Sequence, residues 1–190
     1  MATTQPIRNK KQVKELVDYY LNKGQPRNHV LVTMSIHTAL RIGDLLRLTW
    51  DDLYDFDKGR VRKNITLIEE KTGKTKTIAL HKSVVCALTM YAPDAAAPGR
   101  AIIANPRTGK AISRVQAYRL IRAASEALEF EEHVSCHSLR KTFGYFAWKA
   151  GVLPVMLMDI YNHSSFDITR RYLGIAQDDR DKVYLSMALF

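Results

Sequence analysis

The chain has 190 residues, and its 29 Lys and Arg outnumber its 19 Asp and Glu, which gives a formal net charge of +10 with six His counted as neutral. An apolar fraction of 46% and a charged fraction of 25% are ordinary for a globular protein and exclude wholesale disorder. No apolar run approaches the ~18 residues of a membrane-spanning helix, and we expect no signal peptide because the first residues lack an apolar core. The charge excess indicates a polyanionic partner, most economically a nucleic acid.

The first half of the chain predicts helices followed by a short stretch of strands. Apolar residues at helical spacing predict helices over residues 10–22, 27–40 and 43–48. Between residues 60 and 80 the pattern becomes strand-like, and Lys71-Thr72-Gly73-Lys74 is typical of a hairpin turn.

The second half predicts helices almost to its end. A helix over residues 82–91, a surface loop over 92–99 and a short strand over 101–104 come first. Ser113 and Gln116 then form a capping-box pattern that begins a helix. The remaining helices are predicted over residues 137–150, 153–161, 165–173 and 178–189. The fold class is therefore mainly α with a small antiparallel β-sheet, an α+β fold.

Basic residues are concentrated before and within the helix that Ser113 begins. Between Ala95 and Ser125 there are six basic residues and no acidic one. Four polar residues of this helix share one side: Arg114, Tyr118, Arg119 and Arg122. Such a face can contact phosphates or enter a major groove, although a solvated face on a basic protein has the same pattern. The acid-free run favours nucleic acid.

Common enzyme signatures are incomplete in this sequence. Gly73-Lys74-Thr75 resembles the end of a phosphate-binding P-loop, but Ile68 stands where that motif needs a glycine. The acidic pairs Asp51-Asp52 and Asp178-Asp179 lie beside predicted helix starts, where carboxylates favour the positive end of the helix dipole. No metal site is predicted.

A dispersed set of basic residues remains. His137 and Arg140 share one face in the first turn of a predicted helix, where free backbone N–H groups attract anions. Arg41 lies upstream, and we expect Asp44, three positions later, to orient it. His163 precedes another helix start. Taken singly, each of these residues has an ordinary structural explanation.

Together, three stretches resemble the motif boxes of the tyrosine recombinases of phage-integrase type. They read TALRIGDLLRL over residues 38–48, HSLRKTF over 137–143 and NHSSFDITRRY over 162–172. Their order and spacing match the family, and Glu70-Lys71-Thr72-Gly73 falls where the family keeps its hairpin lysine. The resemblance covers about residues 27–184 and implies the family's catalytic-domain fold, a helical domain with a small three-stranded sheet.

The resemblance also implies a phosphodiester clamp and a nucleophile. Planar guanidiniums fork onto the non-bridging oxygens of a phosphate, and Arg41 and Arg140 would form that clamp. Tyr172 would attack the phosphorus. Its unperturbed pKa of ~10 makes it a weak nucleophile until a base or a cationic field helps.

Three further residues would move protons or hold the phosphate. By resemblance, His137 takes the phenol proton, Lys71 gives a proton to the leaving 5′ oxygen, and His163 donates to a non-bridging oxygen. The intermediate would be a 3′-phosphotyrosine with a free 5′-hydroxyl. One phosphodiester is exchanged for another of similar energy, so the reaction needs no ATP, metal or other cofactor.

The expected partner is double-stranded DNA, on which the family assembles as dimers or tetramers. The residues predicted to contact DNA are Arg114, Tyr118, Arg119, Arg122, Lys74 and Lys141. Cys86 and Cys136 lie fifty residues apart, which predicts no disulfide framework and fits a reducing cytoplasm. The resemblance implies a bacterial or phage-encoded protein that acts on chromosomal or mobile-element DNA.

Residues 1–190 are predicted to form a single catalytic domain with a loose N-terminal tail over residues 1–9. The segment 178–190 is predicted to be a helix that docks on a neighbouring protomer or folds back on its own domain. Only about twenty-five residues precede the family match. We therefore expect a compact member, or a fragment, without the N-terminal domain that helps most members grip DNA.

Two positions depart from the family pattern, and two other functions remain as alternatives. Asn162 stands where Gly is frequent, and Asp44 where Glu is common. A type IB topoisomerase uses a similar residue set to relax supercoils. A non-catalytic DNA-binding remnant is the other alternative, but all six catalytic-type positions are filled here.

Overall fold

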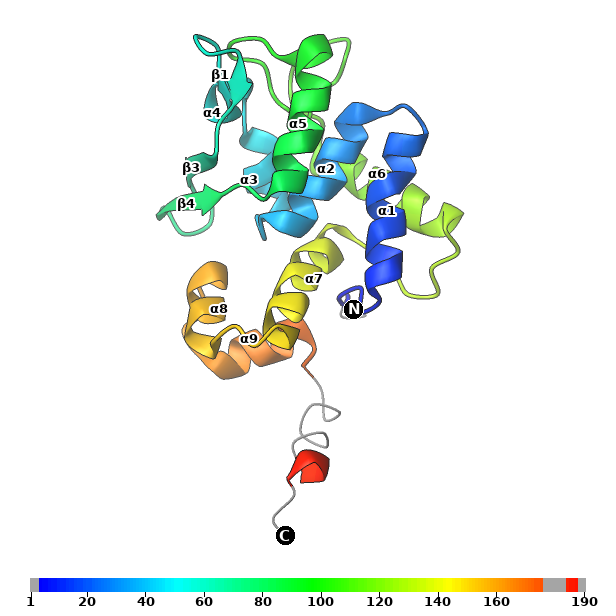
Figure 1. Ribbon diagram of the computed structural model, residues 1–190, viewed down its shortest axis with the longest axis vertical. Coiled ribbons are helices and arrows are strands. Elements are labelled where there is room, and N and C mark those ends of the chain that lie inside the picture. The colour runs from blue at the N-terminus through cyan, green and yellow to red at the C-terminus, as the bar shows by residue number, and fades with distance from the viewer. Residues whose placement is uncertain (1–3, 176–183, 188–190) are drawn as a thin grey trace.

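The computed structural model describes residues 4–175 and 184–187 (Figure 1). Its helices are α1 Lys10–Asn22, α2 Pro26–His37, α3 Ile42–Arg47, α4 Trp50–Leu53, α5 Lys82–Ala95, α6 Arg114–Ala127, α7 Cys136–Lys149, α8 Pro154–Tyr161 and α9 Phe166–Leu173. Its strands are β1 Tyr54–Asp55, β2 Arg60–Val61, β3 Asn64–Ile68 and β4 Thr75–Ala79. Within these residues, no helix has both the length and the apolar character needed to cross a membrane.

Most predicted helices are confirmed, because their ends are set by local side-chain caps. The helix over residues 10–22 is confirmed at both ends, and Asn9 caps it by accepting a hydrogen bond from the Lys11 N–H. Ser113 and Gln116 form the predicted reciprocal capping box at the start of α6. The three helices predicted between residues 137 and 173 match α7, α8 and α9 within one residue.

Three predicted boundaries differ from the structure. Helix α2 ends at His37 rather than Leu40, since Ala39 adopts a left-handed conformation with φ of 52°. Helix α5 continues to Ala95 through the predicted loop, because its last turn packs into the core. The strand predicted over residues 101–104 is reduced to two isolated bridges, Thr49 to Ala101 and Ala104 to Ala111.

The strands form two antiparallel pairs in place of the three-stranded sheet that the resemblance implied. Strand β1 pairs with β2, and β3 pairs with β4 in a register that sets Ile65 opposite Ile78. Arg62 and Lys63 separate β2 from β3, and each makes a backbone hydrogen bond to a different segment of the chain. The Arg62 N–H donates to Leu53 at 2.7 Å, and the Lys63 carbonyl accepts from the Leu80 N–H at 2.8 Å.

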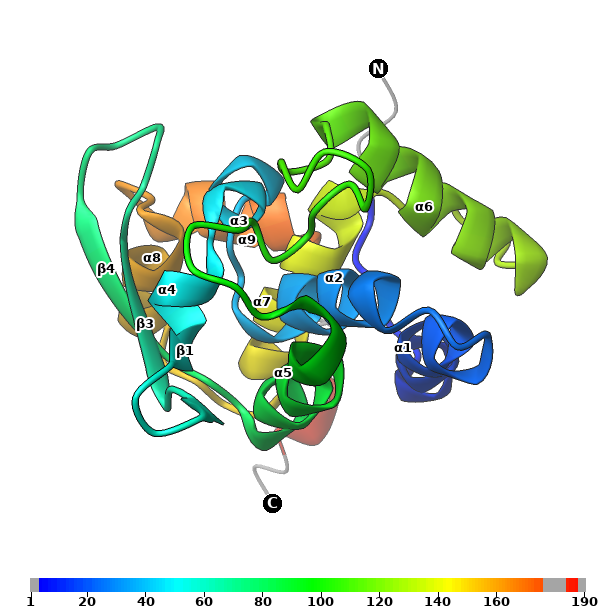
Figure 2. The same cartoon turned by 90° about the horizontal axis from the view of Figure 1, so that it is seen from above.

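Helices α7, α8 and α9 lie together below α2–α5 and the strands in Figure 1, and the β3–β4 hairpin lies next to α8 in Figure 2, where Lys76 bonds to the Ile160 carbonyl. A small core of Ala39, Leu157, Tyr161 and Leu173 joins these helices to the end of α2. Gly144 permits this packing, because a Cβ there would stand 2.8 Å from Tyr161 Cε2. This junction carries the site described below.

The prediction of a loose tail over residues 1–9 is wrong for the residues that the structure describes. Residues 4–9, here called the N-terminal strap, run along α7 and α9. The Ile7 side chain is 2% exposed, and its N–H donates to Thr142 Oγ1 at 2.9 Å. Arg8 Nη2 donates to the Gly174 carbonyl at 3.0 Å. Burial of one apolar side chain and these two hydrogen bonds fix the strap.

Most of the predicted C-terminal helix, including Asp178-Asp179, lies outside the described residues. Residues 184–187 are described, and their side chains are exposed; Tyr184 is 78% exposed. These four residues therefore contribute nothing to the cores of the described domain.

Candidate functional site

The six predicted catalytic residues come from five separate segments of the fold. Arg41 directly precedes α3, and Lys71 lies in the turn between β3 and β4. Helix α7 carries His137 and Arg140 in its first two turns. The site is completed by His163, in the turn before α9, and Tyr172, within α9.

Arg140 is held at the centre of this junction. It is 3% exposed, and its Nη1 donates to the carbonyl of Ala39. The left-handed conformation of Ala39 belongs to the turn that presents this carbonyl, so the unusual backbone lies where the site is assembled. The guanidinium carbon lies 4.8 Å from the ring centre of Tyr161, whose hydroxyl donates to the Arg140 carbonyl at 2.7 Å. Arg140 therefore has a single supported position.

Tyr172 lies against this arginine with its hydroxyl buried. That hydroxyl makes no hydrogen bond of acceptable geometry within the described chain. Burial raises the pKa of Tyr172 above its usual 10.0, whereas the charge of Arg140, the closeness of its N–H donors to the hydroxyl and then the charge of Arg41 act to lower it. Lys141 adds a further positive charge, with Nζ 5.0 Å from the Tyr172 ring centre. The phenol is thus a buried acid in a cationic field.

His163 packs edge-on against Tyr172, with ring centres 5.2 Å apart. Its Nδ1 lies 3.0 Å from Thr169 Oγ1, and that hydroxyl donates to the Ser165 carbonyl at 3.3 Å. Because that bond uses the hydroxyl hydrogen, we assign Nδ1 as the donor of the pair, which leaves Nε2 as the ring nitrogen without a bond. Burial lowers the pKa of His163, and the charges of Arg140, Arg41 and Lys71 lower it further.

His137 occupies the first turn of α7, with its ring centre 6.5 Å from that of Tyr172. Desolvation lowers the pKa of His137 below 6.5, and Arg140, Lys141 and Arg41 act in the same direction. The imidazole is therefore neutral near pH 7 and has a lone pair that can accept a proton.

The structure contradicts the expectation that Asp44 orients Arg41. Arg41 Nη1 instead donates to Glu69 Oε1 at 3.1 Å. Asp44 accepts from Arg47 Nη2 at 3.0 Å and from the Glu70 N–H at 2.8 Å, so it fixes α3 to the β3–β4 hairpin. The three-residue spacing predicted an Arg41–Asp44 pair, but the two side chains bind different partners.

Glu69 is the main residue that the sequence analysis missed. Its side chain is fully buried, and its Oε2 accepts from Thr72 Oγ1 at 2.8 Å and also from the Asn162 amide. Burial alone would raise the pKa of Glu69, but the Thr72 hydrogen bond and the charges of Arg41 and Lys76 hold it below its usual value. The sequence offered one signal for Glu69: an acidic residue beside the lysines of the hairpin motif.

Asn162 connects this carboxylate to the α8–α9 turn. It adopts a left-handed conformation with φ of 55°, which Asn tolerates better than most residues. Its side chain reaches Glu69, and Lys74 Nζ donates to its Oδ1 at 3.3 Å. The departure from the family's glycine thus supplies a link between the hairpin and His163.

The hairpin lysines occupy different environments. Lys71 is exposed and makes no hydrogen bond or ion pair within the described chain; it affects the site through its charge near His163. Lys76, which the sequence analysis did not select, donates from Nζ to the Ile160 carbonyl. Burial lowers the pKa of Lys76, and the charge of Glu69 opposes that effect.

The predicted DNA-binding residues lie in unequal environments. On α6, Arg114 Nη2 pairs with Glu70 Oε2 at 2.6 Å, Arg122 pairs with Glu126, and Tyr118 Oη lies 3.0 Å from His133 Nε2. Arg119 is exposed and makes no contact of this kind with the described residues.

Lys141 is a correction to the predicted DNA contacts. It is 7% exposed, and its Nζ donates to the Thr4 carbonyl at 2.6 Å beneath the N-terminal strap. Its ammonium group is therefore engaged by the strap and is not displayed on the surface. Its positive charge acts on Tyr172 instead.

The acidic pair Asp51-Asp52 has structural partners. Asp52 Oδ2 accepts from the Thr49 N–H at 2.7 Å in a capping box, and Asp51 Oδ2 accepts from the Gly99 N–H at 2.6 Å. Over residues 4–175 and 184–187, no three His, Cys, Asp or Glu side chains cluster as metal ligands would.

Comparison with known proteins gives the family of this arrangement. A model of the phage integrase family matches residues 8–178. Over 184 residues the chain is 36% identical to the probable integrase/recombinase YoeC of Bacillus subtilis, and the match covers 97% of each chain. It is 25% identical to the tyrosine recombinase XerC of Xanthomonas campestris pv. campestris over 158 residues, covering 83% of this chain and 47% of XerC.

Among solved structures, the XerH site-specific recombinase bound to a palindromic difH substrate in a post-cleavage complex has the same fold. The TM-score is 0.75 at 14% identity, and the match covers 96% of this chain and 53% of that chain. The present chain thus spans almost all of YoeC but about half of XerC and XerH.

Proposed function

The chain belongs to the phage integrase family, and on that premise we propose that it is a site-specific recombinase that cleaves and rejoins DNA through Tyr172. One observation carries the proposal. The Tyr172 hydroxyl is buried without a partner beside two imidazoles and under the charges of Arg140 and Arg41. A buried hydroxyl that lacks a hydrogen bond is costly to a fold, and such groups are retained where chemistry needs them.

In the proposed reaction, Arg41 and Arg140 bind the non-bridging oxygens of the scissile phosphodiester. The bonds from Arg41 to Glu69 and from Arg140 to Ala39 leave other N–H groups of each guanidinium free for the phosphate. The two positive charges also stabilise the negative charge that builds up during in-line attack.

The phenol oxygen of Tyr172 then attacks the phosphorus, and the bond to the 5′ oxygen breaks. His137 accepts the phenol proton, in keeping with its lowered pKa, and Lys71 gives a proton to the departing 5′ oxygen. The products are a 3′-phosphotyrosine and a free 5′-hydroxyl. Attack by a second 5′-hydroxyl reverses these steps and joins the strands.

His163 changes its protonation state in this scheme. Since Nδ1 is committed to Thr169, Nε2 can donate to a phosphate oxygen only when the ring is protonated. The surrounding cations lower its pKa in the absence of DNA, and a bound phosphate would raise it again. DNA binding is therefore coupled to uptake of a proton at His163.

We also propose that the protein acts as a dimer or tetramer on double-stranded DNA within the bacterial cytoplasm, as one catalytic domain. The family membership and the net charge of +10 support DNA as the partner, and the Bacillus subtilis relative supports a bacterial setting.

Covalent trapping tests the reaction. The full chain is incubated with nicked duplexes drawn from the flanking genomic sequence, and the products are run on a denaturing gel. We expect a DNA–protein adduct that is absent in Tyr172→Phe. Tyr145→Phe is the matched control, because it removes a tyrosine hydroxyl from α7, outside the site, and it should keep the adduct.

An adduct that persists in Tyr172→Phe would overturn the assignment of the nucleophile. Relaxation of a supercoiled plasmid that lacks any specific site would instead indicate topoisomerase activity.

A further inference from the structure

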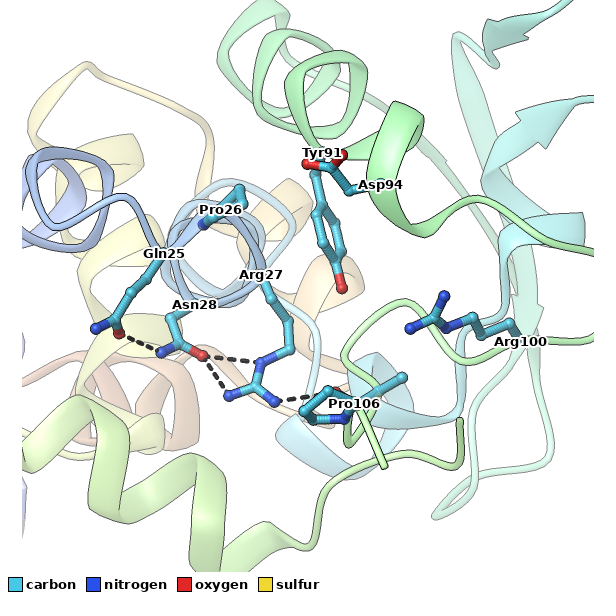
Figure 3. A pocket seen from close by; sticks show the side chains of 9 residues that line it. Gln25, Pro26, Arg27, Asn28, Tyr91, Asp94, Arg100 and Pro106 are labelled. Atoms are coloured by element: carbon cyan, nitrogen blue, oxygen red, sulfur yellow. Dashed lines mark hydrogen bonds between the residues drawn. The ribbon is translucent and has the colours of Figure 1, made fainter. Parts of the chain in front are cut away.

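A cavity of about 380 Å³ lies at the N-terminal end of α2, between that helix, the end of α5 and the loop that follows α5 (Figure 3). Arg41 follows the opposite end of α2, and a helix of twelve residues spans roughly 18 Å. The cavity is therefore separate from the site around Tyr172, and the proposed recombination chemistry gives it no role.

Arg27 lines one side of the cavity in a fixed position. Its Nε and Nη2 donate to Asn28 Oδ1 at 3.0 and 2.8 Å, and its Nη1 donates to the Ala104 carbonyl at 3.0 Å. Asn28 is held in turn by a 2.8 Å hydrogen bond to Gln25 Oε1. These bonds orient the guanidinium but use three of its five N–H donors, and no carboxylate of the described chain pairs with it.

Arg100 faces Arg27 across the cavity in Figure 3. Its Nη1 makes one long hydrogen bond, 3.4 Å, to the Ala95 carbonyl, and its Nε is buried with no partner. No carboxylate within the described residues pairs with this guanidinium. Asp94 is the single acidic residue among those that line the cavity.

Tyr91 supplies a third possible donor to the cavity. Its side chain is 7% exposed, and its hydroxyl points into the cavity between the two arginines (Figure 3). Within the described residues that hydroxyl has no hydrogen-bond partner. The hydroxyl can therefore donate to a ligand in this space, and the unpartnered buried atom of the cavity is Nε of Arg100.

The start of α2 adds to the same field. Pro26 occupies the first turn and has no N–H, but the following amides stand at the positive end of the helix dipole. Two unneutralised guanidiniums, a free phenol and this helix end therefore converge from separate elements on one cavity. The lining offers many donors and few acceptors, which is the chemistry of an anion site.

We propose that this cavity binds a phosphoryl group, held by Arg27, Arg100 and Tyr91. Donors approach from several directions, which suits the tetrahedral oxygens of a phosphate better than the two coplanar oxygens of a carboxylate. The phosphate belongs either to a small phosphorylated metabolite or to a DNA backbone. The volume lies at the lower end of small-ligand pockets and accommodates a phosphate with a sugar-sized body.

Calorimetric titration of the full chain with inorganic phosphate, AMP and acetate tests this site. The Tyr172→Phe background prevents strand cleavage, so the result does not depend on recombinase activity. We expect phosphate and AMP to bind and acetate to bind far more weakly. Arg100→Gln should weaken binding about tenfold and Tyr91→Phe several-fold, as expected for one lost hydrogen bond to a charged group.

Two further variants keep the result interpretable. Arg62→Gln removes an exposed arginine outside the cavity and should bind like the parent. Arg100→Lys keeps the charge while losing the planar fork, and should fall between the parent and Arg100→Gln. Thermal unfolding of each variant checks that it is folded.

A short duplex then distinguishes the two sources of phosphate. Competition between the duplex and AMP that is lost in Arg100→Gln would identify the DNA backbone as the ligand. AMP binding without competition would identify a small phosphorylated ligand. Failure of phosphate and AMP to bind, or equal binding by the parent and Arg100→Gln, would overturn the proposal.

Discussion

The buried carboxylate of Glu69 accepts a hydrogen bond from Arg41 at 3.1 Å, so the β3–β4 hairpin sets the position of an arginine assigned to the phosphate clamp. The same carboxylate binds Thr72, the residue after Lys71, and Asn162, the residue before His163. One side chain therefore joins the hairpin, the clamp and the α8–α9 turn. Movement of the hairpin would therefore displace three of the proposed catalytic residues: Arg41, Lys71 and His163.

Replacement of this carboxylate should damage both the fold and the reaction. We expect Glu69→Gln to lower the free energy of unfolding by about 2 kcal/mol and adduct formation by at least about tenfold, because an amide cannot accept from Arg41, Thr72 and Asn162 together. Urea denaturation and the rate of covalent trapping measure the two effects.

Glu70→Gln is the matched control for that variant, since the neighbouring Glu70 side chain is 51% exposed and pairs with Arg114 at the surface. Its stability should change by less than about 1 kcal/mol. Equal behaviour of the two variants would show that Glu69 does not hold the site together.

Removal of the proposed nucleophile should stabilise the protein while abolishing the adduct. The Tyr172 hydroxyl is buried without a hydrogen bond, so Tyr172→Phe should raise the free energy of unfolding by about 1 kcal/mol. Tyr161→Phe removes a hydroxyl that donates to the Arg140 carbonyl and should lower it by about 1 kcal/mol. Urea denaturation that gives the same sign for both would contradict the unpartnered state of Tyr172.

The histidines of the site predict a loss of stability at mildly acidic pH. Burial and the nearby arginines lower the pKa values of His137 and His163 below the ordinary 6.5. As pH falls below about 6.5, the unfolded chain takes up these protons before the folded chain does, so the free energy of unfolding decreases. The stability is fully present above pH 6.5, and urea denaturation at pH 7.5, 6.5 and 5.5 should record its loss.

His163→Gln should flatten that decline, because it removes one of three histidines with a lowered pKa; the third, His37, is shifted by burial and by His81 and stays in both proteins. The lowered pKa of Glu69 also favours stability at higher pH, but its contribution is lost below about 4.5 and falls outside this window. A pH profile unchanged by His163→Gln would mean that His163 titrates normally in the folded protein.

Two arginines of α6, the exposed Arg119 and the half-buried Arg122, should differ in their contribution to DNA binding. Arg119 is free of the described acidic residues, whereas Arg122 pairs with Glu126. We expect Arg119→Gln to reduce the slope of log affinity against log salt by about 1, and Arg122→Gln to reduce it less. Gel-shift titrations over a range of salt concentrations measure the slopes.

Lys82→Gln, at the exposed start of α5, is the control for those titrations and should leave the salt slope unchanged. A common slope for Arg119→Gln and Lys82→Gln would exclude the α6 face from the DNA contact.

Features encoded by neighbouring residues were predictable from the sequence, and features that depend on distant partners were not. Ser113 and Gln116 cap α6 within four residues, so their pattern alone was sufficient. Tyr172 was selected through the resemblance to a family and not through a local pattern, and the structure places it beside His163.

The misassigned residues all depend on tertiary contacts. Asp44 stands three positions from Arg41, but its partners are Arg47 and the Glu70 backbone. Lys141 follows Arg140 in a basic motif, yet it is buried because the strap crosses α7. No local pattern indicates that these contacts will form.

The strap also has a consequence for how the protein is made. A hydrogen bond joins Arg8 to Gly174, which stands 166 positions later in the chain. Gly174 is two residues after Tyr172. Chain segments emerge from the ribosome in order, and contacts this distant in sequence close late because the entropy of loop closure must be overcome first. The helix that carries the proposed nucleophile therefore gains this contact only after both Arg8 and Gly174 have been synthesised, so an unfinished chain lacks one of the bonds that fix α9.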